Sequence, residues 1–453
     1  MMVTLAQPTL LGLEKDIRDA NGRINRLEPG DRAFHDWYRF VLAFPPHLVR
    51  TYLQDFGLQP GQVVLDPFCG TGTTLIEAKL NGINSVGLEA NPFAQFASSV
   101  KTDWAIDPDA LVANAQEVAN DALQRLAAQG IDDRCAGAVK TGNGQTGNGH
   151  LKRLDAEAEK LLIKDSISPL PLHKTLVLLE CLTSRQSERY YGHLSLALAN
   201  ALVYSISNLR FGPEVGVDKI KEDVPVIAAW LAAMDRIAGD LRLVTGLARP
   251  SSMVHLADAR QAGEVLAPES VHAVITSPPY PNEKDYTRTT RLESVLLGFI
   301  NSKAELRSFK QQLVRSNTRV VYKGDDDDRW IEHHAGIQRI ADEIEARRID
   351  LGKTSGFERL YGRATRLYFG GMARHLAGLR NVLYPGAQLA YVVGDQASYL
   401  RVMIRTGQLL AEIAQELGYE LVRIDLFRTR FATATKEQLR EEVVVLRWPG
   451  TKR

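Results

Sequence analysis

Residues 61–89 constrain the fold more than any other part of the chain. The letters GQVVLD predict a short buried strand, PFCGTG a tight turn, and TTLIEAKLNG a helix that ends at Gly82. A second strand is expected over 85–89, and it ends at the acidic residue Glu89. Strand, glycine turn, helix and strand together form a β-α-β unit, whose ligands bind at the carboxyl ends of the strands.

Further strands are expected over 253–256, 271–275, 387–393, 419–425 and 442–447. Helical patterns separate most of them, but only a polar segment joins the last two. The sequence therefore predicts an α/β fold with a seven-stranded sheet in unpermuted order and helices on both faces.

Two long segments interrupt this sheet pattern and are expected to be largely helical insertions. Residues 105–250 carry helical periodicity, broken by the glycine-rich stretch 141–149, which we interpret as a flexible loop. Residues 281–385 are polar, helical and locally basic. The predicted organisation is 1–104 (N-terminal element and first half of the sheet domain), 105–250 (first insertion), 251–280 (central strands), 281–385 (second insertion) and 386–453 (C-terminal strands).

Composition excludes several classes of protein. With 45% hydrophobic and 24% charged residues among 453, the chain is expected to be globular. The 55 basic residues nearly balance the 54 acidic ones, so a nucleic-acid surface must be local. Three cysteines, Cys69, Cys135 and Cys181, show no metal-binding spacing, and no metal site is expected. No basic leader or apolar run of about 18 residues appears, so we expect a cytoplasmic location.

The stretch ITSPPYPNEKDY, residues 275–286, stops a predicted strand at two consecutive prolines. Proline has no N–H and holds φ near −65°, so Pro278 and Pro279 end the ladder and fix an extended turn. The backbone carbonyls beside them can then face a ligand. Because Tyr280 follows at once, a planar ligand is expected.

The two turns together resemble the paired signatures of the S-adenosylmethionine-dependent DNA amino-methyltransferases, which modify cytosine N4 or adenine N6. DPFCGTGTT (66–74) is similar to their methyl-donor loop and TSPPY (276–280) to their catalytic loop. Residues 34–40 with Pro45 and Pro46 resemble the element that closes over the methionine end of the donor. The resemblance implies a Rossmann-like methyltransferase sheet, with S-adenosylmethionine as cofactor and double-stranded DNA as substrate.

The resemblance also implies roles for individual residues. Glu89 would bind the ribose, and Asp258 would lie near the adenine, although an aspartate after a strand also serves as a helix cap. Around the methionine moiety the resemblance places Asp66, Phe68, Cys69, Gly70, Thr71, Gly72, Thr73 and Thr74.

The chemistry of the second turn agrees with that family. An exocyclic amine is a poor nucleophile, because its lone pair is delocalised into the ring; the Ser277 hydroxyl and the Pro278 carbonyl can accept hydrogen bonds from its protons. A base must be flipped out of a duplex to reach them, and Tyr280 would stack on it. In the family, serine before Pro-Pro-Tyr favours cytosine N4 and aspartate favours adenine N6, so Ser277 indicates cytosine. Cysteine chemistry at cytosine C5 is excluded because no Pro-Cys dipeptide occurs.

A local basic stretch follows the catalytic turn. Residues 284–323 hold nine basic and three acidic side chains, a net charge of +6, which suits phosphate contacts by Lys284, Arg288 and Arg291. The alternative is a solvated helix face. The run of four aspartates at 325–328 is interpreted as a solvated loop, since a run does not converge on a metal.

Other functions stay open at this point. The loop chemistry also fits adenine N6, an RNA base or another amide nitrogen, and an inactive DNA-binding regulator would keep the same fold. Base readout leaves no signature in a single sequence, so target recognition could lie in 105–250, in 281–385 or in both. The donor loop precedes the catalytic loop, unlike the permuted order common among Ser-Pro-Pro-Tyr enzymes, so a recognition region is not transferred from other members of the family. A restriction endonuclease is a candidate functional partner. The recognition sequence and the oligomeric state leave no signature.

Overall fold

The computed structural model of the chain describes residues 27–40, 43–133, 151–211, 215–247, 250–282, 284–432 and 437–450. Cys135 and the glycine-rich stretch 141–149 lie outside these residues, as does the N-terminal segment before residue 27.

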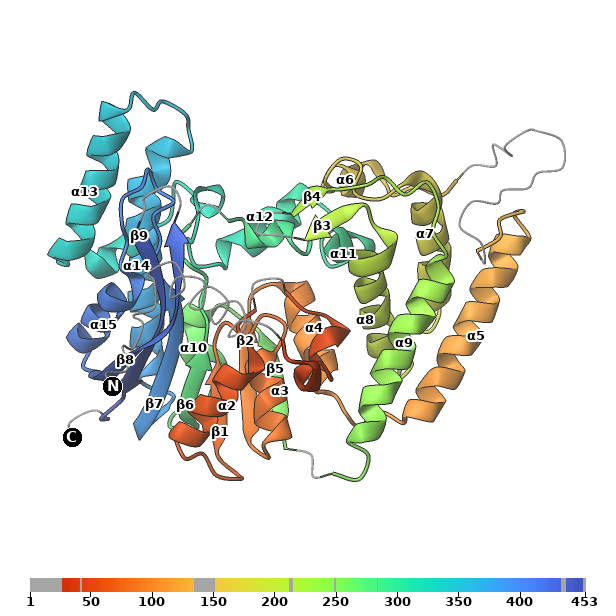
Figure 1. Cartoon of the computed structure of the whole chain (residues 1–453), viewed down its shortest axis with the longest axis horizontal. Helices are drawn as coiled ribbons and strands as arrows, with labels where there is room; N and C mark the ends of the chain where they lie inside the picture. The colour runs from red at the N-terminus through yellow and green to blue at the C-terminus, as the bar shows by residue number, and fades with distance from the viewer. Residues whose placement is uncertain are drawn as a thin grey trace, which may run out of the picture.

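Seven strands form one twisted sheet in the order β5-β2-β1-β6-β7-β9-β8 (Figure 1). The strands are β1 (Val63–Asp66), β2 (Asn84–Glu89), β5 (Ser252–Leu256), β6 (Val271–Thr276), β7 (Leu383–Gly394), β8 (Glu420–Ala432) and β9 (Glu437–Arg447). The first five are parallel, and β9 runs antiparallel to both β7 and β8. The predicted seven-stranded α/β sheet in unpermuted order is confirmed.

The strand order places a topological switch point between β1 and β6. From β1 the chain builds outward through β2 to β5, then returns to pair β6 with the free edge of β1. In open α/β sheets the ligand crevice lies at such a point, outside the carboxyl ends of the strands. Both predicted loops leave the sheet there, since the donor loop follows β1 and the catalytic loop follows β6.

Helices cover both faces of the sheet because its central strands are apolar on both sides. Val64 packs on one face, in a core with α2 and α3, whereas the next residue, Leu65, packs on the other, in a core with α14 and α15. The first face carries α2 (Pro46–Asp55), α3 (Thr73–Leu80) and α4 (Pro92–Thr102); the second carries α10 (Ala262–Val265), α14 (Tyr361–Leu379) and α15 (Thr406–Glu416).

The segment between β2 and β5 forms a helical bundle at the β5 end of the sheet (Figure 1). Its elements are α5 (Pro108–Ala127), α6 (Ala156–Glu159), α7 (Pro169–Thr183), α8 (Tyr191–Ala201), the π-helical turn η3 (Leu202–Ile206), the small hairpin of β3 (Leu209–Phe211) and β4 (Val215–Val217), and α9 (Val226–Leu243). One continuous core joins the bundle to α3, α4 and the N-terminal turn η2 (His35–Trp37), whereas the preceding turn η1 (Pro29–Asp31) has no buried residue. The bundle therefore has no hydrophobic core of its own.

The segment between β6 and β7 passes over the carboxyl ends of the strands before it joins α14. It contains η5 (Tyr286–Arg288), α11 (Arg291–Leu296), α12 (Lys303–Gln311), η6 (Thr318–Val320), η7 (Asp327–Ile331), α13 (Ala335–Asp350) and η8 (Glu358–Leu360), while η4 (Ala259–Gln261) follows β5. The loop between α12 and η6 reaches the crevice at the switch point.

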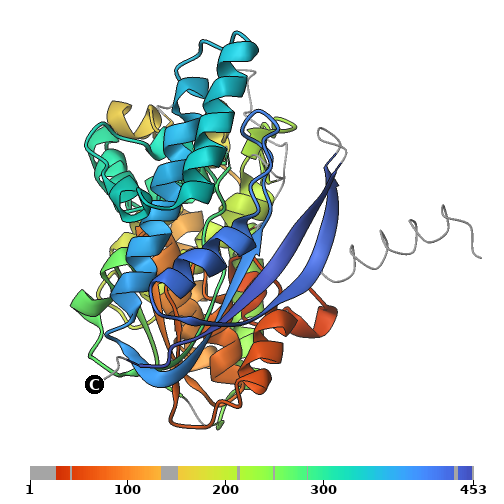
Figure 2. The same cartoon turned by 90° about the vertical axis from the view of Figure 1, so that its left-hand side faces the viewer.

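The last two strands are longer than the sequence indicates. The polar segment expected to join them is itself largely strand, and β8 pairs with β9 as far as Ala432 and Glu437. Cross-strand charge pairing compensates for the low strand propensity of this segment, since Arg428 binds Glu441 at 2.5 and 2.9 Å. The pairing of β8 with β9 continues past the last β7–β9 pair, Gly394 with Glu441, and Figure 2 shows the long two-stranded ribbon that results.

Candidate active site

The turn after β1 needs glycine at two positions. Gly70 and Gly72 have φ values of 51° and 86°, in the left-handed region that favours glycine. At Gly72 a Cβ would also lie 2.5 Å from the hydroxyl oxygen of Ser98 on α4. The chain can therefore turn tightly from β1 into α3 and present the backbone N–H groups at the start of that helix, a feature that suits a ligand carboxylate.

Glu89, at the end of β2, holds this turn in place. Its carboxylate accepts hydrogen bonds from the backbone N–H of Gly70 at 2.8 Å and of Asn91 at 2.7 Å. Burial raises the pKa of Glu89 to about 7, although the two N–H donors favour the charged form. The side chain also faces the cavity described below. It is thus placed to accept further hydrogen bonds from a ligand.

Asp66 is fully buried and joins the two functional loops. Its carboxylate accepts hydrogen bonds from the hydroxyls of Thr74 at 2.7 Å and Thr276 at 2.6 Å and from the backbone N–H of Phe68 at 3.1 Å. Burial raises its pKa to about 6. Asp66 is not among the described residues that line the cavity, so its contacts fit a positioning role better than the ligand contact that the resemblance implies.

The catalytic loop leaves β6 beside β7. The Ser277 hydroxyl donates a hydrogen bond to the backbone carbonyl of Val392 on β7, at 3.2 Å. That bond uses the only hydroxyl proton, so the oxygen lone pairs stay available as acceptors. Ser277, Pro278, Pro279 and Tyr280 all line the cavity.

Gly394, at the end of β7, leaves room for the ring of Tyr280 because it has no side chain. A Cβ at Gly394 would lie 2.9 Å from Cε2 of Tyr280 and 3.2 Å from Cγ of Glu441. Sequence reasoning missed this glycine, because its only signal is a spatial neighbour more than one hundred residues away. The ring therefore lies against bare backbone on one side.

We expect Gly394→Ala to displace the Tyr280 ring and lower methyl transfer by about ten-fold, because overpacking forces a side chain out of its position. The affinity for the methyl donor should stay unchanged. Single-turnover rates and donor titration measure the two effects. Gly239→Ala on α9, where a Cβ meets nothing within 4 Å, is the control. Full activity of Gly394→Ala would show that this contact does not hold the ring.

Both loops open into one cavity of about 600 Å³. Its donor side contains Phe68, Cys69, Gly70, Thr71, Thr73, Glu89 and Asp258; the opposite wall contains Asn282, Gln312, Leu313, Ser316, Gln396, Arg428 and Glu441. Gly72 and Thr74 lie behind this lining, where they shape the turn. The second insertion and the β8–β9 ribbon thus complete a site that starts at the sheet.

Tyr399 links three of the segments that line the cavity by hydrogen bonds. Its buried hydroxyl lies 3.0 Å from the carbonyl of Ser316 and 3.3 Å from that of Asn282. The Asn282 N–H also donates to the Ser316 carbonyl, at 2.9 Å. The catalytic loop, the second insertion and the loop after β7 therefore hold one another. Nothing in the sequence around Tyr399 indicates this function.

The N-terminal segment covers the donor turn. The ammonium group of the buried Lys101 donates to the carbonyls of Tyr38 at 2.7 Å and Thr71 at 2.8 Å, and burial lowers its pKa to about 7. A Cβ at Gly70 would lie 3.3 Å from the ring of Phe40. The segment thus closes one end of the cavity.

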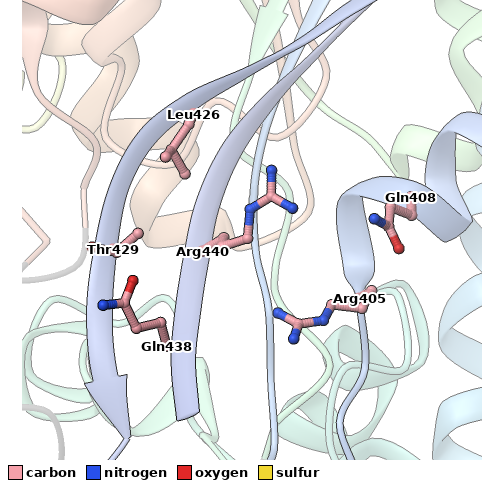
Figure 3. Close-up of a pocket in the computed structure, with 6 residues that line it drawn as sticks. All are labelled: Arg405, Gln408, Leu426, Thr429, Gln438 and Arg440. Atoms are coloured by element: carbon pink, nitrogen blue, oxygen red, sulfur yellow. The ribbon is translucent and has the colours of Figure 1, made fainter.

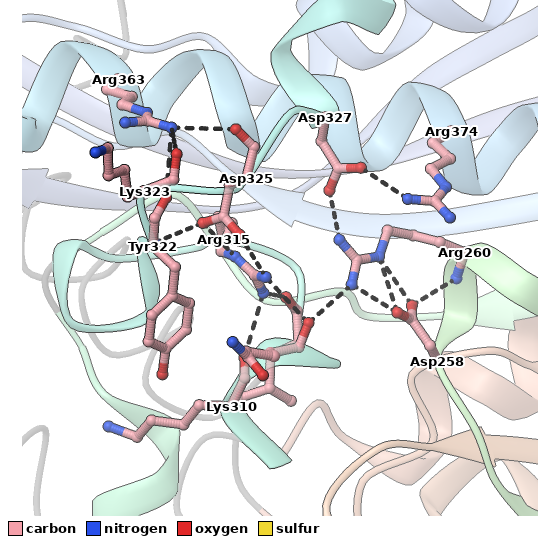
Figure 4. Close-up of polar contacts among 12 residues, drawn as sticks. Asp258, Arg260, Lys310, Arg315, Tyr322, Lys323, Asp325, Asp327, Arg363 and Arg374 are labelled. Carbon is pink, nitrogen blue, oxygen red and sulfur yellow. Dashed lines mark hydrogen bonds and ion pairs between the residues drawn. The ribbon is translucent and has the colours of Figure 1, made fainter. Parts of the chain in front are cut away.

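Asp258 lines the cavity and also caps η4 (Figure 4). Its carboxylate accepts from the backbone N–H of Arg260 at 2.9 Å and from the guanidinium of the same residue at 2.6 Å. The buried guanidinium also pairs with Asp327, whose other oxygen binds Arg374 at 3.2 Å. Asp258 therefore caps η4, which was the alternative to a donor contact. Through Arg260 it is also linked to Asp327 of the second insertion.

The run of four aspartates is not a solvated loop, so that prediction was wrong for two of them. Asp327 is buried in the ion network, and Asp325 binds the buried Arg315 at 2.8 Å (Figure 4). Desolvation of each carboxylate is offset by a guanidinium partner, Arg315 for Asp325 and the more distant Arg260 for Asp327. Sequence alone does not reveal such partners.

Ion pairs also neutralise some of the basic residues of the stretch 284–323. Lys310 binds Asp285 at 2.9 Å, and Arg315 binds Asp325. Arg291 is half-buried and donates to the Thr287 hydroxyl at 2.9 Å, which argues against a phosphate contact. Lys284 lines the cavity and Arg288 lies half-exposed near it, so these two remain our proposals for DNA contacts.

Three further features of the described residues bear on cysteine chemistry, metal binding and membrane insertion. Cys69 is buried beside Gly87, and burial raises the pKa of its thiol. Among the residues with described positions, no three His, Cys, Asp or Glu side chains gather to hold a metal ion. Within that same part of the chain, no helix is long and apolar enough to span a membrane.

Comparisons with known proteins agree with the two loops. A family model described as DNA methylase matches residues 23–97. The type II methyltransferase M.BsoBI of Geobacillus stearothermophilus is 25% identical over 448 residues, which cover 92% of this chain and 84% of that protein. The type II methyltransferase M.AvaI of Nostoc sp. is 23% identical and covers 91% of this chain and 86% of its own. Together with the two loops, these similarities support an S-adenosylmethionine-dependent DNA amino-methyltransferase.

A crystal structure of TrmN from Thermus thermophilus aligns with 92% of this methyltransferase and 52% of its own chain, with 12% identity and a TM-score of 0.30. That likeness is too low to carry an argument, and the strand order given above establishes the fold.

S-adenosylmethionine is the cofactor of this family, and the donor side of the cavity fits it. Gly70 and Thr71 of the turn line the cavity without bulky side chains, and Glu89 lines the same space. A carboxylate suits ribose hydroxyls, and helix N–H groups suit an amino-acid carboxylate.

Proposed function

We propose that this methyltransferase modifies the N4 amino group of a cytosine that is flipped out of duplex DNA into the cavity. The observation that carries the proposal is the Ser277 hydroxyl. Ser277 lines the cavity, and its hydroxyl donates its proton in a hydrogen bond of 3.2 Å to the Val392 carbonyl, which leaves the oxygen lone pairs as acceptors.

An exocyclic amine becomes a better nucleophile when its protons are held by acceptors, because the nitrogen lone pair is then less delocalised into the ring. The Ser277 oxygen and the backbone carbonyl of Pro278 supply two such acceptors on the rigid diproline turn. Bound S-adenosylmethionine supplies an electrophilic methyl group on the donor side of the same cavity.

Tyr280 supports the proposal of a flipped planar base. Its ring is backed by the bare backbone of Gly394 and lines the cavity. Stacking on an aromatic ring is worth about 1–3 kcal/mol per base, which offsets part of the cost of unstacking it from the duplex. The volume of about 600 Å³ has room for a base beside the donor.

The choice of cytosine over adenine rests on Ser277 at the first position of the loop. A serine hydroxyl is neutral, and its acceptors suit an amine without adding a charge. In the family this residue accompanies cytosine N4, whereas aspartate accompanies adenine N6. M.BsoBI and M.AvaI, which match over most of the chain, are named type II methyltransferases, which supports a further proposal that a restriction endonuclease accompanies this enzyme.

The product identifies the reaction directly. When purified protein is incubated with S-adenosylmethionine and mixed-sequence duplex DNA, and the DNA is digested to nucleosides, we expect mass spectrometry to find N4-methylcytosine. N6-methyladenine would keep the amine mechanism and overturn the choice of cytosine. If labelled methyl groups went only to RNA, or to no nucleic acid, the substrate proposal would be wrong.

A further inference from the structure

The β8–β9 ribbon extends beyond the rest of the sheet. β7 pairs with β9 only from Gln388 to Gly394, and the last of these pairs joins Gly394 to Glu441. β8 continues to pair with β9 beyond that point, through Arg430 and Leu439. Past the end of β7 the ribbon is therefore a free two-stranded element, and Figure 2 shows it running away from the sheet.

The two faces of the ribbon meet different spaces. Arg428, Arg430, Leu439 and Glu441 line the active-site cavity on the inner face. The outer face lines a separate open groove of about 670 Å³ together with the start of α15 (Figure 3). This groove contains Arg405, Gln408, Leu426, Thr429, Gln438 and Arg440. A substrate that places a base in the cavity therefore contacts the ribbon.

Buried carboxylates hold the two arginines of the outer groove. Arg405 binds Asp395 at 2.6 Å, and Arg440 binds Glu442 at 2.6 Å. The carboxylates are only 1% and 3% exposed, whereas the arginine side chains are 38% and 39% exposed. Figure 3 shows both guanidinium groups in the space between β9 and α15. Their orientation is fixed, their charge is locally balanced, and each keeps further N–H donors.

This balance decides which part of DNA the groove suits. Phosphate contacts depend on uncompensated positive charge, whereas base edges are recognised by the pattern of donors and acceptors. Two fixed guanidinium groups and two glutamine amides supply such a pattern, since arginine pairs with guanine and glutamine with adenine. Two apolar side chains on the ribbon, Leu426 and Phe431, are 54% and 60% exposed, as expected for contacts with bases.

We propose that the β8–β9 ribbon enters a groove of the DNA duplex and that Gln438 and Arg440, with Gln408 of α15, read the base edges beside the flipped base. The proposal rests on the DNA methylation proposed above. The major groove is about 12 Å wide and admits a two-stranded ribbon. Sequence recognition then lies outside the two insertions in which the sequence led us to expect it.

The test compares Gln438→Ala and Arg440→Lys with matched controls on the same elements. Arg447→Lys changes an exposed arginine at the other end of β9, which pairs with Glu420, and Gln415→Ala changes an exposed glutamine at the other end of α15. Methylated positions in mixed-sequence DNA are mapped by sequencing. Binding to a duplex that contains the mapped target site, and to an unrelated duplex, is measured across salt concentrations. The affinity for the methyl donor and thermal unfolding are measured for each variant.

We expect Gln438→Ala and Arg440→Lys to lower the preference for the target site by roughly ten-fold or more at one or two base positions. The salt dependence of binding, the donor affinity and the controls should stay unchanged. An unchanged site preference in both variants would overturn the role of the ribbon while leaving the methylation proposal intact. Uniform weakening with a smaller salt slope would also overturn it, because phosphate contacts behave in that way. If the wild-type protein methylates no DNA, both proposals fall together.

Discussion

Replacing Ser277 with alanine is expected to lower the rate of methyl transfer by about 10²- to 10³-fold, the usual loss when one preorganised catalytic hydrogen bond is removed. The hydroxyl is the acceptor assigned to the target amine. Its structural contribution is one bond to the Val392 carbonyl, at 3.2 Å, so the fold and the donor affinity should change little. Single-turnover kinetics, donor titration and thermal unfolding measure the three quantities.

Tyr280→Ala extends this test to the base. The loss of stacking should reduce transfer by about ten- to a hundred-fold, and it should also weaken binding of DNA that contains the target site. Ser308→Ala, an exposed serine on α12, is a control for the loss of a hydroxyl. Full activity in both Ser277→Ala and Tyr280→Ala would refute the assigned mechanism, whatever the identity of the product.

The second large effect concerns Glu89, whose pKa is raised to about 7 by burial. Ribose hydroxyls bind the charged carboxylate, so donor affinity should fall by up to about ten-fold for each pH unit below 7. Glu89→Gln should lose about ten- to a hundred-fold in donor affinity at pH 8, and it should no longer show this pH dependence. Isothermal titration of the donor between pH 5.5 and 8.5 measures both.

The contribution of Glu89 to the stability of the fold should change with pH in the direction opposite to its effect on donor affinity. The folded pKa of about 7 lies above the ordinary value of 4.5, so the folded state binds the proton more tightly. The contribution of Glu89 to the free energy of unfolding is therefore highest below pH 4.5 and is lost as the pH rises through 7. Relative to wild type, Glu89→Gln should gain on the order of 2 kcal/mol between pH 5 and pH 8 in denaturant unfolding.

Glu293 supplies a matched control for this pair of effects. It is fully buried, it accepts a hydrogen bond from the Tyr38 hydroxyl, and burial raises its pKa to about 7 as well. It is not among the described residues that line the cavity. Glu293→Gln should change the pH dependence of stability but not that of donor affinity. If Glu89→Gln kept the wild-type pH dependence of donor binding, the assignment of its carboxylate to the donor would be wrong.

Sequence reasoning predicted the local parts of this site because short-range rules govern them. Glycine at positive φ, proline without an N–H and the alternation of apolar residues all act within about ten residues. The turn at Gly70 and Gly72 and the strand end before Pro278 follow from them. The expectation for the segment before β9 was wrong, because a charged strand is stabilised by its partner across the ribbon and not by its own propensity.

The sequence by itself determined the β-α-β unit, the seven strands in unpermuted order, and the two loops that mark a DNA amino-methyltransferase. Only the tertiary structure decided how these loops become one site. Asp66 bonds Thr276 across 210 residues of chain, Gly394 makes room for the Tyr280 ring, and buried partners neutralise Arg315 and Asp327. The physical reason is that such contacts depend on which strands, turns and loops become neighbours in the fold, and no local preference of either residue encodes that.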